Sequence, residues 1–257
     1  MKLHVFGSSA GTEPLPGRHH TSLGFEIGDK LYIFDAGEHC SFAATMMGVD
    51  LIKTRAVFLS HPHVDHVGGL VDLFWVINKL MIVNNRDDVF DIKLFQPAPE
   101  IWQGAELLLR GGGENWNGTY TVCPSLIKDG LLYSDGQVTV EARRNHHIEA
   151  PGSEIFHSFS FRIKAEGKTI VFSGDVRKYT DMGDWLDDCD LLLMETGHHK
   201  ASEVCAGLRA DNCGVKDIIF VHSGRELLND YDGALSRAEA AWGGKLRAAL
   251  DASTFEI

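Results

Sequence analysis

The stretch SHPHVDHVGG, residues 60–69, places three histidines and one aspartate within six positions and ends on a glycine pair. It follows the strand-like segment RAVFLSH and leads into VGGLVDLFWVINKL (67–80), whose apolar residues recur at helical spacing. The cluster therefore belongs to a turn between a buried strand and an amphipathic helix.

Such a turn can aim His61 and His63 in one direction and Asp65 and His66 in another. Neutral imidazole and carboxylate groups are ligands that Zn²⁺ and similar divalent cations accept. A polar loop with incidental histidines is the alternative, but the pattern HxHxDH between a strand and a helix is specific. We interpret the turn as part of a site for two neighbouring metal ions.

Three later segments end a strand-like run on further metal-binding side chains. RNHHIE offers His146 and His147, IVFSGD ends on Asp175, and IIFVHSG contains His222. A strand-terminal aspartate alone is more often a turn residue or a helix cap. Together with the HxHxDH turn, these segments predict a dinuclear site in which the Asp175 carboxylate bridges both ions.

The balance of charges argues against nucleic acid as a general partner. The 257 residues include 24 lysines and arginines and 36 aspartates and glutamates, which gives a net charge of −12. No stretch concentrates basic residues, so a polyanion would on average be repelled. The N-terminal MKLHVFGSSAGTEPL lacks the pattern of a signal peptide, and no apolar run approaches the length that we expect of a membrane span. We expect a cytoplasmic protein without membrane contact, whose five scattered cysteines are reduced.

Strand-like and helix-like segments alternate through both halves of the chain. SLGFEI and KLYIFDA, separated by Gly28 and Asp29, are typical of a β-hairpin. No Pro-rich or Ser-rich linker divides the chain. We therefore expect one domain over residues 1–257, with two mixed sheets face to face and helices outside.

These motifs together resemble the metallo-β-lactamase superfamily, in particular its tRNA 3′-processing endonuclease (tRNase Z) and phosphodiesterase branch. Besides SHPHVDH, the similar pieces cover nearly the whole chain: GSSAGTEP, GRHHTS, FDAGE, SGD, HKAS, VHSGRE and ALDASTFEI. The resemblance implies an α/β fold, a four-layer αββα sandwich of the metallo-β-lactamase type.

The resemblance also implies which residues hold the metal ions. Site one would consist of His61, His63, His147 and Asp175, and site two of Asp65, His66, Asp175 and His222. His146 remains an alternative to His147, because the spacing before SFSFRI is uncertain. Asp35 in FDAGE would support the metal loop by hydrogen bonding. We expect Zn²⁺, and Mn²⁺ or Fe are alternatives, because histidine and carboxylate ligands without cysteine suit all three metals.

By the same resemblance, two ions would share the hydroxide that attacks the substrate. Asp65 would orient or deprotonate this nucleophile, and His199 would donate a proton to the leaving group. HKAS resembles the HEAT motif of the phosphodiesterase branch, but Lys200 replaces its glutamate, so a carboxylate that orients the histidine would be missing. The alternative is that His198 and His199 merely begin the following helix.

Three further residues are candidates for substrate contact. Ser223 and Arg225 could hold phosphate oxygens, because the arginine fork matches an oxyanion. A surface ion pair is the alternative role for Arg225. His20 in GRHHTS would lie near the pocket by resemblance, where it contacts substrate or shapes the loop.

We expect a phosphodiesterase that acts on a small or nucleotide-like phosphodiester, such as a cyclic nucleotide, a cyclic phosphate or an oligonucleotide end. The chain lacks the basic arm with which tRNase Z grips tRNA, so extended tRNA binding is not expected. Hydrolysis of a carboxyl ester, thioester or lactone is the rival activity, and a catalytically idle metal-binding sensor is the second alternative. Relatives are often dimers, so a homodimer is an option, although no stripe of side chains identifies an interface.

Overall fold

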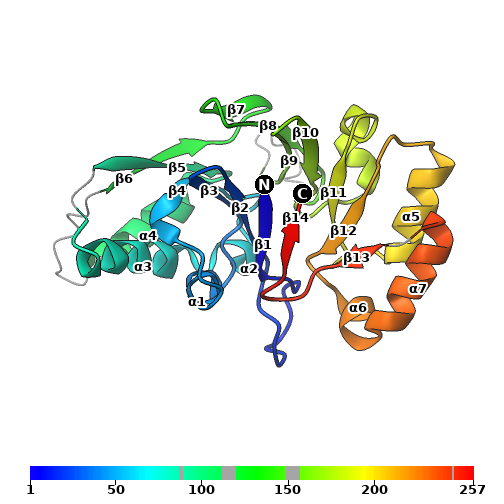
Figure 1. The fold of residues 1–257 in the computed structure, drawn as a ribbon, viewed down its shortest axis with the longest axis horizontal. Helices are drawn as coiled ribbons and strands as arrows, with labels where there is room; N and C mark the ends of the chain where they lie inside the picture. Colours follow the sequence, from blue (N-terminus) through cyan, green and yellow to red (C-terminus); the bar gives the residue numbers. More distant parts are fainter. Residues whose placement is uncertain (87–88, 112–119, 149–156, 245) are drawn as a thin grey trace. The chain divides into compact units, whose positions relative to one another are not determined.

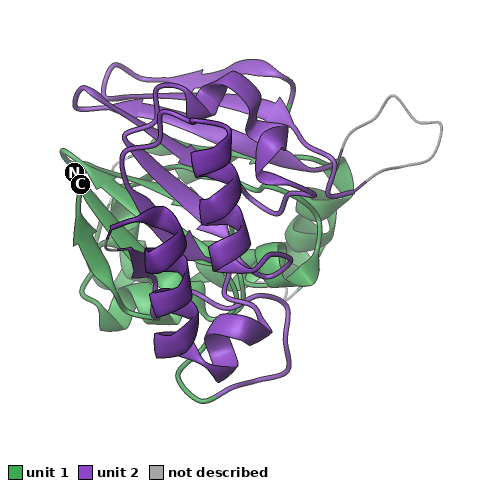
Figure 2. Ribbon diagram, turned by 90° about the vertical axis from the view of Figure 1, so that its right-hand side faces the viewer, with its two compact units in different colours: residues 1–7, 16–127, 251–257 green, residues 8–15, 128–250 purple. Residues whose placement is uncertain are grey.

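The computed structural model describes residues 1–257 except 87–88, 112–119, 149–156 and 245. Its contacts divide the chain into two compact units, shown in different colours in Figure 2. Unit 1 consists of residues 1–7, 16–127 and 251–257, and unit 2 of residues 8–15 and 128–250. The predicted single domain over the whole chain stays a prediction.

Unit 1 is built on a seven-stranded mixed sheet in the order β14-β1-β2-β3-β4-β5-β6. The hairpin predicted around Gly28 and Asp29 is present: β2 and β3 pair antiparallel, and Gly28 adopts a positive φ of 59° in the turn. Strands β3 to β6 pair in parallel. The strands are β1 (Lys2–Gly7), β2 (Ser22–Ile27), β3 (Lys30–Phe34), β4 (Thr54–Phe58), β5 (Phe90–Gln96), β6 (Tyr120–Leu126) and β14 (Thr254–Glu256).

Helices of unit 1 pack their apolar sides against this sheet (Figure 1). Buried Leu73, Phe74 and Ile77 of α3 join the same core cluster as Ile33 and Val57 of the sheet. The helices are α1 (Cys40–Met46), the short 3₁₀ helix η1 (Leu51–Lys53), α2 (Val64–Val67), α3 (Leu70–Val83) and α4 (Pro99–Gly111).

The segment Val64–Val83 is long and apolar enough to cross a membrane, by length and composition only, contrary to the expectation from the sequence. The core helix of a globular fold passes the same test, and Leu70, Leu73 and Phe74 are almost fully buried within unit 1. The segment is therefore weak evidence for a membrane, and the packing of its inward-facing side chains in unit 1 accounts for part of its apolar character.

Unit 2 carries a second seven-stranded sheet, in the order β13-β12-β11-β10-β9-β8-β7. Strands β7 to β10 pair antiparallel, and β10 to β13 pair in parallel. The strands are β7 (Gly130–Ser134), β8 (Val138–Arg144), β9 (Phe159–Ala165), β10 (Lys168–Phe172), β11 (Leu191–Glu195), β12 (Ile218–Val221) and β13 (Arg247–Ala248).

The helices of unit 2 bury one face each against its sheet. Val204, Cys205 and Leu208 of α5 join a core cluster with Leu192 and Phe220 of the sheet. The helical elements are the 3₁₀ helix η2 (Tyr179–Leu186), α5 (Ala201–Ala210), α6 (Arg225–Asn229) and α7 (Tyr231–Trp242).

In each unit, parallel strands deliver polar side chains to the edge where the strands end. In unit 1, Asp35 follows β3, and Ser60 and His61 follow the neighbouring β4. In unit 2, Asp175 follows β10, and His222 follows β12, two strands away in the same sheet. Loops at the carboxyl ends of parallel strands are the usual place for functional groups in α/β folds.

Candidate metal centre

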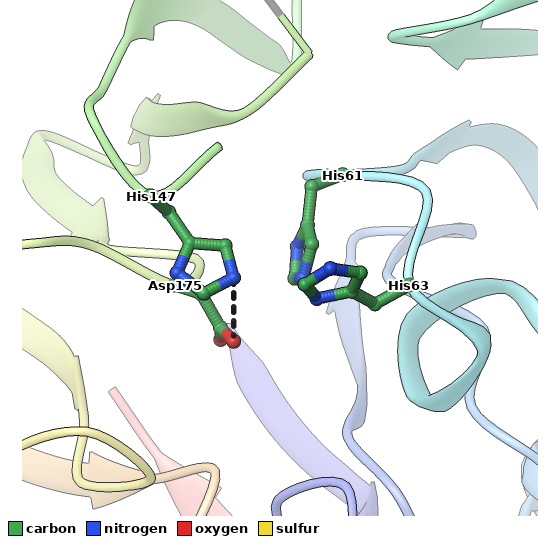
Figure 3. A group of neighbouring side chains, drawn as sticks. All are labelled: His61, His63, His147 and Asp175. Carbon is green, nitrogen blue, oxygen red and sulfur yellow. Dashed lines mark hydrogen bonds and ion pairs between the residues drawn. The ribbon is translucent and has the colours of Figure 1, made fainter. Parts of the chain in front are cut away.

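The HxHxDH turn of unit 1 brings its first two imidazoles together. His61 lies just beyond β4 and is fully buried, and His63 precedes the first turn of α2 with an extended backbone. The Nε2 atom of His61 is 3.0 Å from Nδ1 of His63, so the two rings converge (Figure 3). Two imidazole nitrogens this close are arranged as a pair of ligands for one cation.

Asp35 fixes the orientation of this turn. Its carboxylate accepts hydrogen bonds from the Ser60 amide at 2.6 Å, from the Ser60 hydroxyl at 2.8 Å and from Nδ1 of His66 at 2.7 Å. The second ring nitrogen of His66, Nε2, then lies 3.4 Å from Oδ2 of Asp65. The predicted supporting role of Asp35 is confirmed: it fixes the His66 tautomer that leaves Nε2 available as a ligand.

Unit 2 gathers its donors around Asp175. The Oδ1 atom of this carboxylate is 3.4 Å from Nδ1 of His222, and Oδ2 is 3.7 Å from Nε2 of His147 (Figure 3). Asp175 and His222 are both almost fully buried. His222 has a left-handed backbone with φ 49°, a strained conformation for a non-glycine residue, which persists at sites where a side chain must be re-aimed.

The two histidines of RNHHIE have different partners. His147 faces Asp175, and 12% of its side chain is exposed. His146 is 53% exposed, and its Nδ1 atom lies 3.1 Å from Oδ1 of Asp181. Within unit 2, His147 therefore lies beside Asp175, whereas His146 donates a hydrogen bond to Asp181.

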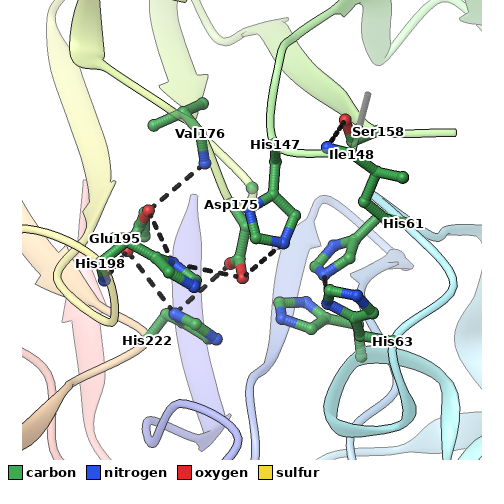
Figure 4. Close-up of polar contacts among 12 residues, drawn as sticks. His61, His63, His147, Ile148, Ser158, Asp175, Val176, Glu195, His198 and His222 are labelled. Carbon is green, nitrogen blue, oxygen red and sulfur yellow. Dashed lines mark hydrogen bonds and ion pairs between the residues drawn. The ribbon is translucent and has the colours of Figure 1, made fainter. Parts of the chain in front are cut away.

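Glu195, the last residue of β11, is a buried carboxylate that the sequence analysis missed. It accepts hydrogen bonds from the backbone amides of Val176 at 3.3 Å and His198 at 2.9 Å (Figure 4). Its Oε1 atom lies 3.2 Å from Nδ1 of His198 and 3.3 Å from Nε2 of His199. The expectation that no carboxylate orients His199 is thus wrong, because Glu195 supplies the carboxylate that is missing at Lys200.

The signal for Glu195 was present in the sequence. LLLMET ends a buried strand on a carboxylate, as IVFSGD does at Asp175. Because the HKAS motif follows the strand, the prediction considered the residues after the strand and not the carboxylate at its end.

Proximity to Glu195 changes the protonation of the neighbouring histidines. The hydrogen bond to Glu195 raises the pKa of His198 and that of His199, although partial burial opposes the shift. Burial would raise the pKa of Glu195, but hydrogen bonds from His198, His199 and His222 hold that pKa well below its usual range. The cluster therefore favours an ionised carboxylate beside protonated imidazoles.

The histidine pair lies in the loop before α5 rather than within the helix, which begins at Ala201. Nε2 of His199 donates to the Val176 carbonyl at 2.9 Å, and its side chain is 18% exposed. The His198 side chain is 46% exposed, and its Nδ1 atom lies 3.7 Å from Oδ2 of Asp175. His199 is thus anchored, whereas His198 is the more accessible of the two.

Gly197 permits the close packing of this loop against His222. A Cβ atom built on Gly197 would overlap both Nδ1 and Cε1 of the His222 imidazole. Any larger residue would have to displace a predicted metal ligand.

The three candidate substrate residues have protein partners or are buried. Arg225 forms a two-pronged ion pair with Glu13, with Nη1 at 2.9 Å from Oε1, which is the alternative role considered for it. Ser223 is fully buried, and within the described part of the chain its hydroxyl has no hydrogen-bond partner. His20 pairs with the Glu38 carboxylate. Their contacts with substrate stay predictions.

Unit 2 thus presents a donor set suited to divalent cations, and unit 1 supplies donors of the same chemical types. In unit 2, Asp175, His198 and His222 each offer one ligand atom, and these atoms lie within 4.8 Å of one another. The donors are imidazoles and carboxylates without cysteine, which suits Zn²⁺, Mn²⁺ or Fe. Members of the sets are His61, His63, Asp65 and His66 in unit 1, and His147, Asp175, His198 and His222 in unit 2.

Comparison with known proteins agrees with this arrangement. Ribonuclease Z from Nitrosopumilus maritimus is 23% identical over 277 aligned positions, which cover 86% of this chain and 89% of that protein. Among solved structures, the metallo-β-lactamase fold protein YhfI from Bacillus subtilis has a TM-score of 0.75 at 19% identity, with 99% of each chain covered.

Two further structures share the fold. The short form of human tRNase Z has a TM-score of 0.72 at 19% identity and covers 100% of this chain and 99% of its own. Yeast PDE1 has a TM-score of 0.66 at 13% identity, with the same coverage. The predicted fold class and superfamily are therefore confirmed, and these relatives include metal-dependent hydrolases of the kind predicted.

One family model covers most of the chain. The model described as anti-Pycsar protein Apyc1 matches residues 1–210, most of the chain. With its metallo-β-lactamase fold and its histidine–aspartate clusters, the chain belongs to the anti-Pycsar protein Apyc1 family.

Proposed function

We propose that this protein is a metal-dependent phosphodiesterase that hydrolyses a small or nucleotide-like phosphodiester. The observation that carries the proposal is the pair His198 and His199 on the buried Glu195 carboxylate, with His198 beside Asp175. A phosphodiester releases an alkoxide, which needs a proton, and this cluster favours protonated imidazoles next to a predicted metal ligand.

Two divalent ions are proposed to bind to these imidazole and carboxylate donors. Site one would consist of His61, His63, His147 and Asp175, and site two of Asp65, His66, Asp175 and His222. The chemistry of the donors and the resemblance to metallo-β-lactamases support these sets. We propose Zn²⁺ first, with Mn²⁺ or Fe as alternatives. When bound, such ions lower the pKa of water and neutralise charge on phosphoryl oxygens.

Residues of the chain are proposed to remove a proton from the attacking water and to donate one to the leaving oxygen. A water oxygen forms a bond to phosphorus, the bond between phosphorus and the leaving oxygen breaks, and a phosphomonoester and an alcohol result. Asp65 is proposed to orient the water or take its proton. His199 is proposed to donate a proton to the leaving oxygen, with Glu195 holding the imidazole protonated. His198 is the second candidate donor, because it is more exposed than His199.

A small substrate suits the charge of the chain better than a polynucleotide does. The net charge of −12 opposes association with long RNA, although ribonuclease Z is among the relatives. A cyclic nucleotide, a cyclic phosphate or an oligonucleotide end carries few charges and avoids most of this repulsion. We therefore propose that extended tRNA is not a substrate.

A homodimer is proposed as the form in solution. Large apolar side chains are exposed on two helices of unit 1: Ile82 and Val83 on α3, and Leu107 and Leu108 on α4, each at least 60% exposed. Exposed apolar side chains on neighbouring elements favour association of copies. Light scattering coupled to gel filtration tests this, and a mass of 28.4 kDa would show a monomer instead.

The proposed activity is tested with a panel of esters. Protein loaded with Mn²⁺ or Zn²⁺ should hydrolyse bis(p-nitrophenyl) phosphate faster than nitrocefin, a thioester or a homoserine lactone. The reverse ranking would move the protein to the carboxyl-ester class, and tight metabolite binding without any turnover would make it a sensor. His199→Ala should abolish turnover while the bound metal per chain stays constant, and His198→Ala run beside it decides which imidazole donates the proton.

A further inference from the structure

Asp181 joins the two loops of unit 2 that carry His147 and Asp175. Its Oδ2 atom accepts hydrogen bonds from the backbone amide of Arg177 at 3.2 Å and from that of His146 at 3.3 Å. Its Oδ1 atom accepts a third hydrogen bond from Nδ1 of the His146 imidazole at 3.1 Å. One carboxylate thus holds the backbone next to both proposed ligands, one position before the histidine and two after the aspartate.

The helix that carries Asp181 is itself fixed to the rest of unit 2. Met182 and Trp185 of η2 are buried in the core of this unit. Arg143 of β8 donates to the Met182 carbonyl, and its guanidinium lies 4.4 Å from the centre of the Trp185 ring. A Cβ atom on Gly183, whose φ is 55°, would lie only 2.7 Å from Nη1 of Arg143, so glycine is needed for this contact. The position of the Asp181 carboxylate is therefore set by packing outside the two loops.

The two proposed ligands lie at nearly the separation that a shared ion requires. Nε2 of His147 is 3.7 Å from Oδ2 of Asp175 (Figure 3). Two ligand atoms about 2.0–2.1 Å from a tetrahedral ion lie about 3.3 Å from each other. Holding donors in their bound arrangement strengthens binding, because less conformational freedom is lost when the ion binds. A group that sets this separation therefore contributes to metal affinity without being a ligand.

A second connection joins the same two loops where they leave their strands. The Asn145 side-chain amide donates to the Ser160 hydroxyl at 3.2 Å, and that hydroxyl donates to the Ser173 carbonyl at 2.6 Å. All three residues are fully buried. This chain of hydrogen bonds ties the start of each loop to the sheet independently of Asp181. Loss of the Asp181 carboxylate should therefore leave the fold intact and shift only the parts of the loops beyond the strand ends.

We propose that Asp181 is a positioning residue that sets the separation of His147 and Asp175, and thereby the affinity and geometry of the ion that these two share. It acts through the backbone of the two loops. In this it differs from Asp35, which accepts a hydrogen bond from the imidazole of a proposed ligand directly. The inference rests on the proposed metal binding by His147 and Asp175, and on no step of hydrolysis.

The test is Asp181→Ala in the full chain, with Co²⁺ as the probe ion. Alanine has no acceptor, so both loops lose their connection to η2. Competition with a chromophoric chelator measures the Co²⁺ affinity, which should fall about tenfold or more. The visible absorption spectrum of bound Co²⁺ reports its coordination geometry and should change as well. The matched control is Asp187→Ala, an exposed carboxylate at the C-cap of η2, which should keep the wild-type affinity and spectrum.

Asp181→Asn separates position from charge. Its side-chain oxygen can accept from both backbone amides, and the His146 ring can accept from its nitrogen, so the loops stay joined without the negative charge. This variant should therefore bind Co²⁺ within about threefold of wild type. A loss as large as that of Asp181→Ala would overturn the proposal, because the charge of Asp181 and not its hydrogen bonds would then support the ion.

Wild-type affinity and spectrum in Asp181→Ala would also overturn the proposal, even if the free energy of unfolding falls, because Asp181 would then serve only the fold. If Asp181→Ala does not fold, Asp181→Glu replaces it: the charge is kept on a longer side chain that displaces the loops, and the same loss is expected. A wild type that binds Co²⁺ but hydrolyses no ester would refute the proposed phosphodiesterase alone, since the test needs no turnover. A wild type that binds no Co²⁺ would refute this role together with the metal centre.

Discussion

Replacing Asp35 by asparagine should disturb the metal loop without removing any predicted ligand. The Asp35 Oδ2 atom accepts from the Ser60 hydroxyl at 2.8 Å and from His66 Nδ1 at 2.7 Å. In Asp35→Asn, an amide NH₂ at this position faces two donors. His66 must then carry its proton on Nε2 to accept from the amide, and a protonated Nε2 cannot bind a cation.

The size of the effect follows from these contacts. Loss of an outer-shell partner of a ligating histidine weakens metal affinity about 10–100-fold, or about 1.4–2.7 kcal/mol. Hydrogen bonds to a buried charged group contribute about 1.5–3 kcal/mol, so the metal-free protein should also lose free energy of unfolding by about that amount. Metal affinity is measured by competition with a chromophoric chelator, and stability by urea unfolding in EDTA.

A matched control separates this effect from a general loss of one negative charge. Asp91 is a surface carboxylate of the same unit, and its partner is Lys93 at 3.0 Å. Asp91→Asn should leave metal affinity and stability at the wild-type level. Metal affinity within twofold of wild type in Asp35→Asn would refute the reasoning, because the His66 tautomer would then not depend on this carboxylate.

Three further changes test other parts of the account. Gly197→Ala should displace the His222 imidazole and weaken metal binding at least about tenfold. The control is Gly104→Ala in α4, where a Cβ would meet nothing within 4 Å; it should keep metal binding and stabilise the helix by up to about 1 kcal/mol. Equal metal affinity in the two variants would contradict this prediction. His147→Ala should reduce the metal bound per chain, while His146→Ala should not, and elemental analysis of both variants would expose the opposite result. The hydrogen bond from Arg162 lowers the pKa of Glu141 below its ordinary value of 4.5, so this carboxylate stabilises the fold above about pH 4.5 and stops doing so as the pH falls through the lowered value. Glu141→Gln should therefore lose less than about 1 kcal/mol at pH 7, and this loss should shrink as the pH is lowered. A loss that grows toward acid in urea unfolding would show that the sign is wrong.

Much of the fold could be predicted from local chemistry. The turn at Gly28 and Asp29 requires only a glycine with positive φ between two alternating segments, so the hairpin was evident. The apolar periodicity after the HxHxDH turn also predicted a helix. The structure begins that helical stretch earlier, at Val64, and interrupts it at the pair Gly68 and Gly69, because α2 ends there and α3 begins at Leu70.

The candidate site was predictable where a donor ends a strand, and less so where its partners are distant in sequence. Asp175 and His222 were identified because each follows a buried strand. The Arg225 ion pair with Glu13 joins residues 212 positions apart, which no local pattern could indicate. Glu195 was missed although it ends β11, because a carboxylate within an apolar strand end is not distinguishable from a turn residue until its histidine partners are located.

The apolar segment Val64–Val83 is a second feature that the local sequence could not explain. Val64–Val83 is apolar enough to resemble a spanning segment by composition, and only the structure shows that Leu73, Phe74 and Ile77 pack in the core of unit 1. Composition reports how apolar a helix is, but not what covers it.

The central proposal is that the imidazole and carboxylate donors at the strand ends hold two divalent ions. Counting the metal ions bound per chain, by native mass spectrometry after loading with Zn²⁺, tests it most directly. We expect two ions per chain in the wild type and fewer in both His61→Ala of unit 1 and His222→Ala of unit 2. A wild-type chain that binds no ion or one, or two ions retained in either variant, would contradict the account.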